Sequence, residues 1–98
     1  MHAFQKWKRQ LHVGEIVMGS ATLHRQPKDH AVAQVTATVT EINDGSVKLS
    51  LKYTKDLKEF LPELVLRKAN VTEYGNSFRI LYEEKSVLYV FVVLNQHM

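Results

Sequence analysis

Five histidines in a chain of 98 residues raise the question of a metal site. His24 and His30 border one polar segment that also contains Asp29, and imidazole and carboxylate groups are common zinc ligands. Neither helical nor strand spacing brings the two imidazoles together, and a transition metal takes three or four well-placed ligands. The pattern favours solvated loop histidines, and the sequence predicts no metal and no other cofactor.

Acid–base and nucleophilic chemistry have no better support. Glu83 and Glu84 are adjacent carboxylates in a predicted turn, where such pairs face solvent instead of a cleft that shifts a pKa. No serine lies in a glycine-flanked nucleophile elbow, and Gly14 and Gly19 do not form a phosphate-binding loop. The chain has no cysteine, which excludes thiolate catalysis and disulfides. We therefore predict no catalytic residues and a non-enzymatic protein.

Basic residues give a stronger signal. The formal net charge is +3, and the whole excess falls in residues 1–30, because residues 31–98 hold eight basic and eight acidic side chains. Such cations can hold the phosphates of RNA or DNA. This hypothesis requires one contiguous patch that is not interspersed with carboxylates. The candidate nucleic-acid-binding residues are Lys6, Lys8, Arg9, Arg25, Lys28, Lys48 and Lys52.

Three aromatic side chains could stack on bases if they were exposed. Trp7 is in phase with Phe4 and Leu11, so the core is its expected place. Tyr53 is in register with Val35 of a predicted hairpin and is expected to be half buried, whereas Tyr74 lies in a turn.

The elements that must position these residues begin with a helix at Phe4–Leu11, predicted by an apolar stripe at i, i+3 and i+7. Residues 15–23 predict a strand in which Ile16 faces the core. The polar segment His24–His30 has no period and contains a proline, which predicts a loop.

Asn43-Asp44-Gly45 predicts a three-residue hairpin loop with glycine where a left-handed backbone is needed. Closing the hairpin there pairs Val39 with Leu49 on an apolar face, and a one-residue slip would exchange the faces of one strand. The same register pairs the following residues: Glu41 with Val47, Ala37 with Leu51, Val35 with Tyr53, Thr40 with Lys48, Thr38 with Ser50, and Thr36 with Lys52.

A second short helix is predicted at Asp56–Leu61, limited by Pro62. A strand at residues 64–71 and a turn at residues 74–76 follow. Phe78, Ile80 and Tyr82 then alternate with polar residues and predict a further strand. A two-residue turn at Glu84-Lys85 would place Phe78 opposite Phe91 and Ile80 opposite Tyr89.

The last predicted strand, Val87–Leu94, is apolar on both faces. It is therefore a central strand, a barrel strand covered by the helices, or a subunit contact, because a bare apolar edge would aggregate. This run motivates the alternative function, an assembly or adaptor protein that binds a partner or a second copy through Val87–Leu94.

Together these elements predict one domain over residues 1–98, of the β-dominated α+β class. Its architecture is a small antiparallel barrel or strongly curved sheet of five to seven strands with two short helices. No signal peptide or 20-residue apolar span is present, which favours a soluble cytoplasmic protein. The predicted core consists of Ile16, Val35, Val39, Leu49, Leu51, Leu57, Phe60, Ile80, Leu88, Val90 and Val92.

Two segments carry a family resemblance. Residues 39–52 resemble the closing hairpin, and residues 13–19 the opening strand, of the OB-fold RNA-binding domains named after the largest small-subunit ribosomal protein. The Val13-Gly14-Glu15 step into a strand is also similar to PUA-like domains, which mostly bind RNA. Both resemblances imply a small barrel and an RNA-binding or regulatory role, and neither assigns a functional residue.

Overall fold

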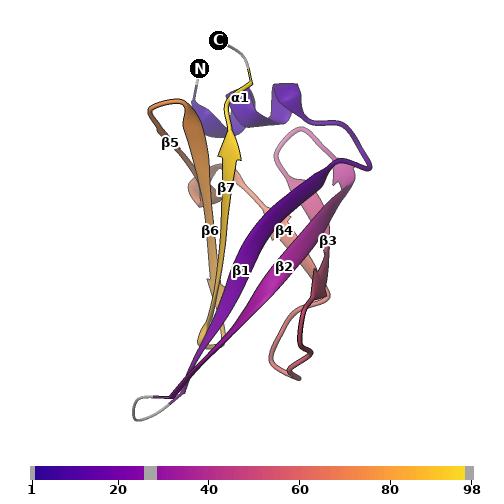
Figure 1. The fold of residues 1–98 in the computed structure, drawn as a ribbon. Helices are drawn as coiled ribbons and strands as arrows, with labels where there is room; N and C mark the ends of the chain where they lie inside the picture. Colours follow the sequence, from indigo (N-terminus) through magenta and orange to yellow (C-terminus); the bar gives the residue numbers. More distant parts are fainter. Residues whose placement is uncertain (1, 26–28, 97–98) are drawn as a thin grey trace.

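Seven antiparallel strands form a single curled sheet in the order β4-β3-β2-β1-β7-β6-β5 (Figure 1). The computed structural model describes residues 2–25 and 29–96. The β-dominated, strongly curved sheet predicted from the sequence is confirmed. In chain order the elements are α1 (Ala3–Gln10), β1 (Ile16–Arg25), β2 (Asp29–Ile42), β3 (Val47–Tyr53), β4 (Glu63–Leu66), the 3-10 turn η1 (Lys68–Asn70), β5 (Val71–Tyr74), β6 (Ser77–Glu84) and β7 (Val87–Leu94).

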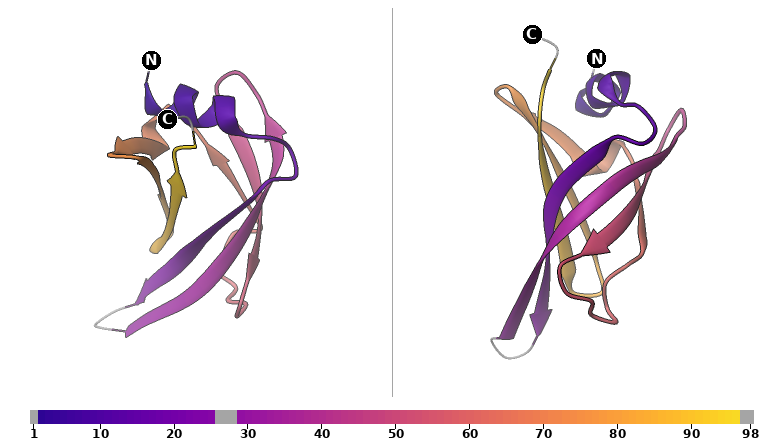
Figure 2. Two further views of the ribbon diagram at one scale, coloured as in Figure 1. Left: turned by 45° about the horizontal axis from the view of Figure 1, so that its top comes forward. Right: turned by 45° about the vertical axis from the view of Figure 1, so that its right-hand side comes forward.

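Helix α1 lies across one open end of the curled sheet (Figures 1 and 2). The side chains of Phe4, Trp7 and Leu11 are buried against the inner face of the sheet, as the apolar stripe predicted. Lys8 and Arg9 occupy the last turn of the helix, where positive charge is favourable beside the unpaired carbonyls. The helix thus caps the core, and Trp7 is not available for stacking on a base.

The β2–β3 hairpin confirms most of the predicted register. Val35, Ala37 and Val39 lie opposite Tyr53, Leu51 and Leu49, with Thr36 and Thr38 opposite Lys52 and Ser50. A bulge between Val39 and Glu41 shifts the remaining pairs, so that Glu41 lies opposite Lys48 and not Val47. The predicted three-residue loop is therefore wrong: the loop has four residues, 43–46, and Gly45 does not adopt the left-handed backbone expected of it. The predicted pair of Thr40 with Lys48 is likewise replaced, and the Thr40 hydroxyl donates to the Lys48 carbonyl oxygen at 3.3 Å.

The predicted helix at Asp56–Leu61 is wrong, because this segment is a turn held by one helical-type bond from Phe60 N to the Leu57 carbonyl oxygen (3.0 Å). Six residues that end before a proline form too few helical hydrogen bonds to offset the unfavourable free energy of helix nucleation. The apolar side chains of the segment still pack against the core, with Phe60 buried and Leu57 half buried.

The single strand predicted at residues 64–71 is two strands, β4 and β5, separated by η1. The Asn70 side chain makes this break: its carbonyl oxygen accepts from Arg67 N at 2.9 Å, and its amide nitrogen donates to the Leu81 carbonyl oxygen at 2.9 Å. The chain thereby leaves β3 and reaches β6 at the opposite end of the sheet.

The β6–β7 turn consists of Lys85 and Ser86, both at positive φ (52° and 68°), and not of Glu84 and Lys85. Ile80 therefore lies opposite Phe91, and Phe78 opposite Val93. The predicted aromatic pairs are therefore displaced by two residues. A two-residue hairpin turn needs left-handed backbone at both positions, and here Lys85 and Ser86 adopt it although neither is a glycine. The turn predicted at Tyr74-Gly75-Asn76 is confirmed, with Gly75 at φ 56°.

Four residues of the predicted core point outward: Ile16, Leu88, Val90 and Val92. Their neighbours Val17, Val87, Tyr89 and Phe91 are buried instead. Both faces of β7 are apolar, so hydrophobicity alone does not show which face belongs to the core. The pairing register with β6 determines it. The other core assignments hold, Leu57 only partly.

The segment predicted as a loop at His24–His30 is largely strand. β1 continues to Arg25 and β2 starts at Asp29, with His24 paired to His30. Residues 26–28 lie outside the described part of the chain. Local polarity predicted a loop, but pairing between two long strands overrides it.

Gly19 allows β1 and β7 to approach each other closely. A β-carbon at this position would collide with the Val90 carbonyl oxygen and the Phe91 ring. Glycine inside a strand typically marks such a close approach of backbones.

We expect Gly19→Ala to destabilise the protein by about 1–3 kcal/mol, because a methyl group must displace backbone and ring atoms of β7. Gly45→Ala is the matched control, since no atom lies within 4 Å of a β-carbon there. Urea unfolding of both variants measures the difference. Equal stability of the two variants would contradict the role assigned to Gly19.

Candidate interaction surface

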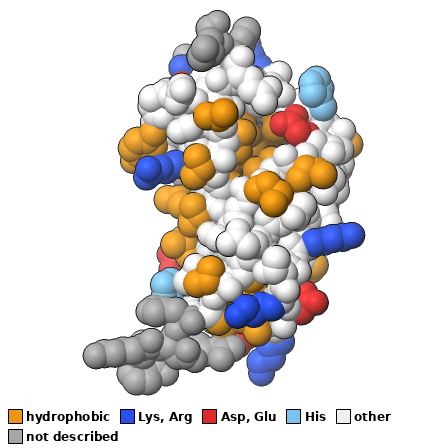
Figure 3. Space-filling model, in the orientation of Figure 1, with side chains coloured by type: hydrophobic (Ala, Val, Ile, Leu, Met, Phe, Trp, Pro, Cys, Tyr) orange, Lys and Arg blue, Asp and Glu red, His pale blue; other side chains and the backbone are white. Residues whose placement is uncertain are grey.

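Exposed apolar side chains gather on the outer face of the sheet over β1, β7 and β6 (Figure 3). We call this set the outer apolar patch. The exposed fractions of Met18, Val92 and Leu94 are 61%, 58% and 66%. The full patch consists of Ile16, Met18, Leu81, Leu88, Val90, Val92 and Leu94.

Strand register places these side chains together. β7 lies between β1 and β6, with Val90 opposite Ser20 on one side and Leu81 on the other. Every outward-facing residue of β7 is apolar, namely Leu88, Val90, Val92 and Leu94. A strand of a sheet with one solvated face normally alternates apolar residues inward with polar residues outward, so a central strand that is also apolar on its outer side departs from the ordinary pattern.

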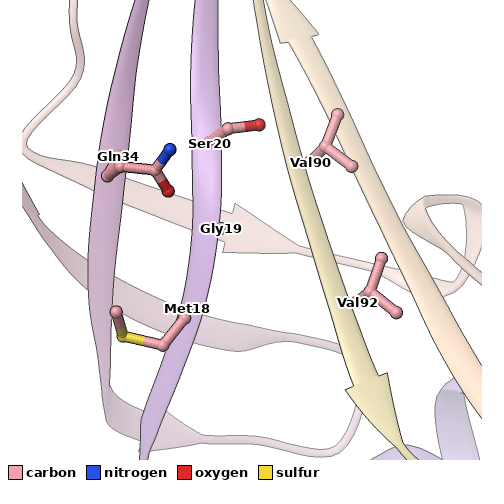
Figure 4. A pocket seen from close by; sticks show the side chains of 6 residues that line it. All are labelled: Met18, Gly19, Ser20, Gln34, Val90 and Val92. Atoms are coloured by element: carbon pink, nitrogen blue, oxygen red, sulfur yellow. The ribbon is translucent and has the colours of Figure 1, made fainter.

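A shallow hollow of about 330 Å³ lies within the patch between β1 and β7 (Figure 4). Met18, Ser20 and Gln34 border it on one side, and Val90 and Val92 on the other. The backbone of Gly19 also lines it. The hollow is open and holds no charged group, which suits an apolar side chain of a partner better than a phosphate or a metal ion.

The basic residues predicted to bind phosphate occupy a different region. Lys6 donates from Nζ to Glu73 Oε1 at 3.0 Å, which ties α1 to β5. Lys8 donates from Nζ to the carbonyl oxygens of Asn43 (3.2 Å) and Asp44 (2.5 Å), which ties α1 to the β2–β3 loop. These two lysines hold the helix across the open end of the sheet.

Carboxylates also lie beside Lys8 and beside Lys48, another of the predicted phosphate-binding residues. Lys8 Nζ is 3.9 Å from Asp44 Oδ1, and Lys48 Nζ is 3.8 Å from Glu41 Oε2. Arg9 and Lys52 are exposed. The Arg25 side chain and Lys28 lie outside the described residues. Three of the predicted phosphate-binding residues are thus engaged in ion pairs within the chain.

The carboxylates considered for acid–base chemistry point in different directions. Glu83 is exposed on the outer face, whereas Glu84 Oε1 accepts from the Tyr82 hydroxyl at 2.6 Å. No group of three or more potential metal ligands occurs within the described ranges 2–25 and 29–96.

A tyrosine cluster holds the loop after β3 against the inside of the sheet. The Tyr53 hydroxyl donates to the Leu61 carbonyl oxygen at 2.5 Å, and Leu61 N donates to the Tyr89 hydroxyl at 3.0 Å. The Tyr53 ring stacks on Phe60, and the Tyr82 ring packs edge-on against Tyr89.

The cluster keeps its phenols protonated. Burial raises the pKa of Tyr53 and of Tyr89, and the hydrogen bond to the Glu84 carboxylate raises the pKa of Tyr82. A phenol with a raised pKa is a poor general base at neutral pH. The cluster therefore closes one end of the core and offers no activated group.

No protein family model, curated protein or solved structure matches this chain. The OB-like and PUA-like resemblance therefore stays a prediction. Within the described part of the chain, no helix has the length and apolar character needed to span a bilayer.

The apolar strand Val87–Leu94 is evident from the sequence, but the residues that surround it are not. Met18 and Leu81 belong to the patch because β1 and β6 flank β7, which no local pattern shows. One signal in the sequence could have indicated these residues. The first residues of β1 are apolar on both faces, because Ile16 and Met18 on the outer face are as apolar as the inward-facing residues.

We expect the free energy of unfolding to fall as pH rises above about 10, the pKa of an unfolded tyrosine. The unfolded chain then releases phenolic protons that the folded chain retains, so the equilibrium shifts toward unfolding. Urea titrations across this pH range measure the slope. Tyr53→Phe should make the slope shallower, and an identical slope would contradict the assignment.

We expect Lys8→Ala to lower the free energy of unfolding by about 1–2 kcal/mol, because two carbonyl oxygens lose a charged donor. Arg9→Ala, one residue along the same helix, should stay within about 0.5 kcal/mol of the wild type. Thermal and urea unfolding distinguish the two variants. Equal effects would show that Lys8 does not hold the helix.

Proposed function

We propose that this protein is a small assembly or adaptor module that binds a protein partner through the outer apolar patch. The observation that carries the proposal is the wholly apolar outer face of β7, a central strand with Val92 and Leu94 more than half exposed. Large contiguous apolar surfaces on a folded domain are typical of binding sites for other proteins.

The position of the patch defines the kind of contact. β7 is paired on both sides, so its backbone cannot accept an added strand. A partner must instead pack its side chains on the face of the sheet, as one sheet packs on another in a sandwich. The hollow between Met18 and Val92 would receive an apolar side chain of that partner.

Charge supports protein binding over nucleic-acid binding at this surface. Phosphate backbones are held by several cations, but the outward residues of β7 carry no charge. The lysines of α1 are engaged in contacts within the chain, as described above. Nucleic-acid binding through the seven basic residues named from the sequence stays a separate prediction that the same sample can test.

A photo-reactive benzophenone amino acid at the position of Val92 tests the proposal in the native host. We expect covalent adducts of defined mass from this position. The same probe at Lys52, exposed on the outer face of β3, is the matched control and should give none. Val92→Lys, combined with the probe at Met18, should abolish the adducts while changing stability by about 0.5 kcal/mol or less.

Equal adduct yields at the two positions, or no adduct at Val92, would overturn the proposal. A labelled RNA and DNA pool, titrated across a salt series, provides the alternative outcome. Binding that weakens with salt and is lost in Lys52→Glu would move the function to the basic residues.

A further inference from the structure

Two opposite charges are arranged symmetrically on β6, at the border of the outer apolar patch. Arg79, Leu81 and Glu83 are the consecutive outward residues of this strand. Each charged residue lies two positions from Leu81, about 7 Å along the strand. Within the described residues, neither Arg79 nor Glu83 forms an ion pair.

The neighbouring strand repeats the symmetry with apolar residues. Arg79 lies beside Val92, Leu81 beside Val90, and Glu83 beside Leu88. The row through Leu81 and Val90 is therefore flanked by one row with a positive charge and one row with a negative charge. Each flanking row also contains one aliphatic side chain of β7.

Such a surface is complementary to itself under one specific rotation. A two-fold axis in the plane of the face, perpendicular to β6 and passing over Leu81, exchanges the two flanking rows. Arg79 of one copy then meets Glu83 of the other, twice per pair, while Val92 meets Leu88 of the other copy. Leu81 and Val90 lie on the axis and meet themselves.

Rotations about an axis parallel to the strands lack this property. An axis along β6 would place Arg79 against Arg79, and an axis along β7 would place Arg79 over the apolar side of the patch near Met18. Like charges in contact and a buried unpaired guanidinium are both unfavourable. The charge pattern thus selects a single arrangement.

We propose that the occupant of the outer apolar patch is a second copy of this chain, packed face to face about the two-fold axis that crosses β6 at Leu81. This inference rests on the proposed function, which it completes with the identity of the partner. The Tyr74 ring, 4.5 Å from the Arg79 guanidinium carbon, restricts the arginine and so reduces the entropy lost when it pairs.

Light scattering during size exclusion, over a range of protein concentrations, tests the pairing. We expect a dimer whose dissociation constant rises about tenfold or more in Arg79→Glu and in Glu83→Arg, because each change brings like charges together. The double variant should return to within about threefold of the wild type, since it restores both ion pairs. Lys52→Glu, a charge reversal on β3, should leave the dimer unchanged.

The remaining outcomes overturn this inference in distinguishable ways. A dimer weakened by Val92→Lys but indifferent to the charge reversals would retain the patch as the interface and reject the two-fold arrangement. A monomer at every concentration, with cross-linked adducts of another protein at Val92, would reject the second copy and keep the proposed function. A dimer unaffected by Val92→Lys, with no cross-linked adduct at Val92, would reject both. Far-UV circular dichroism confirms that each variant is folded.

Discussion

The close contact between β1 and β7 at Gly19 governs the rest of the structure. It joins the first strand of the chain to the last, so that β1–β4 and β5–β7 form one sheet instead of two small ones. A side chain at this position would collide with β7, and glycine removes the collision. Because of this pairing β7 is central, its inner face belongs to the core, and its outer face becomes part of a broad surface.

The two ends of the curled sheet are closed by different interactions. At one end α1 inserts Phe4 and Trp7 and is held on both sides by Lys6 and Lys8. At the other end Tyr53 and Tyr89 fix the loop after β3 through the backbone of Leu61. Both closures use polar groups at the margin of an apolar core. The core excludes water from one side of each hydrogen bond, and the lower local dielectric strengthens the bond.

These closures explain why the basic residues and the candidate interface are separate. The lysines near the N-terminus are engaged in contacts that hold the helix. The outer face of β7 has no such role within the described part of the chain, and its residues are nevertheless apolar. An apolar outer face buries less surface than the core side of the sheet and raises the risk of aggregation of an isolated domain. The proposed binding to a partner would give this composition a physical reason.

Local sequence determined the parts of this protein that depend on neighbouring residues. The helix face of Phe4, Trp7 and Leu11 follows from their spacing, and the β2–β3 register up to Val39 follows from one apolar alternation. Tertiary structure decided the rest. β7 is apolar on both faces, so only its pairing with β1 and β6 selected Tyr89 and Phe91 as core and exposed Val92. The pairing with β1 joins residues about 70 positions apart along the chain, beyond the range of any local pattern.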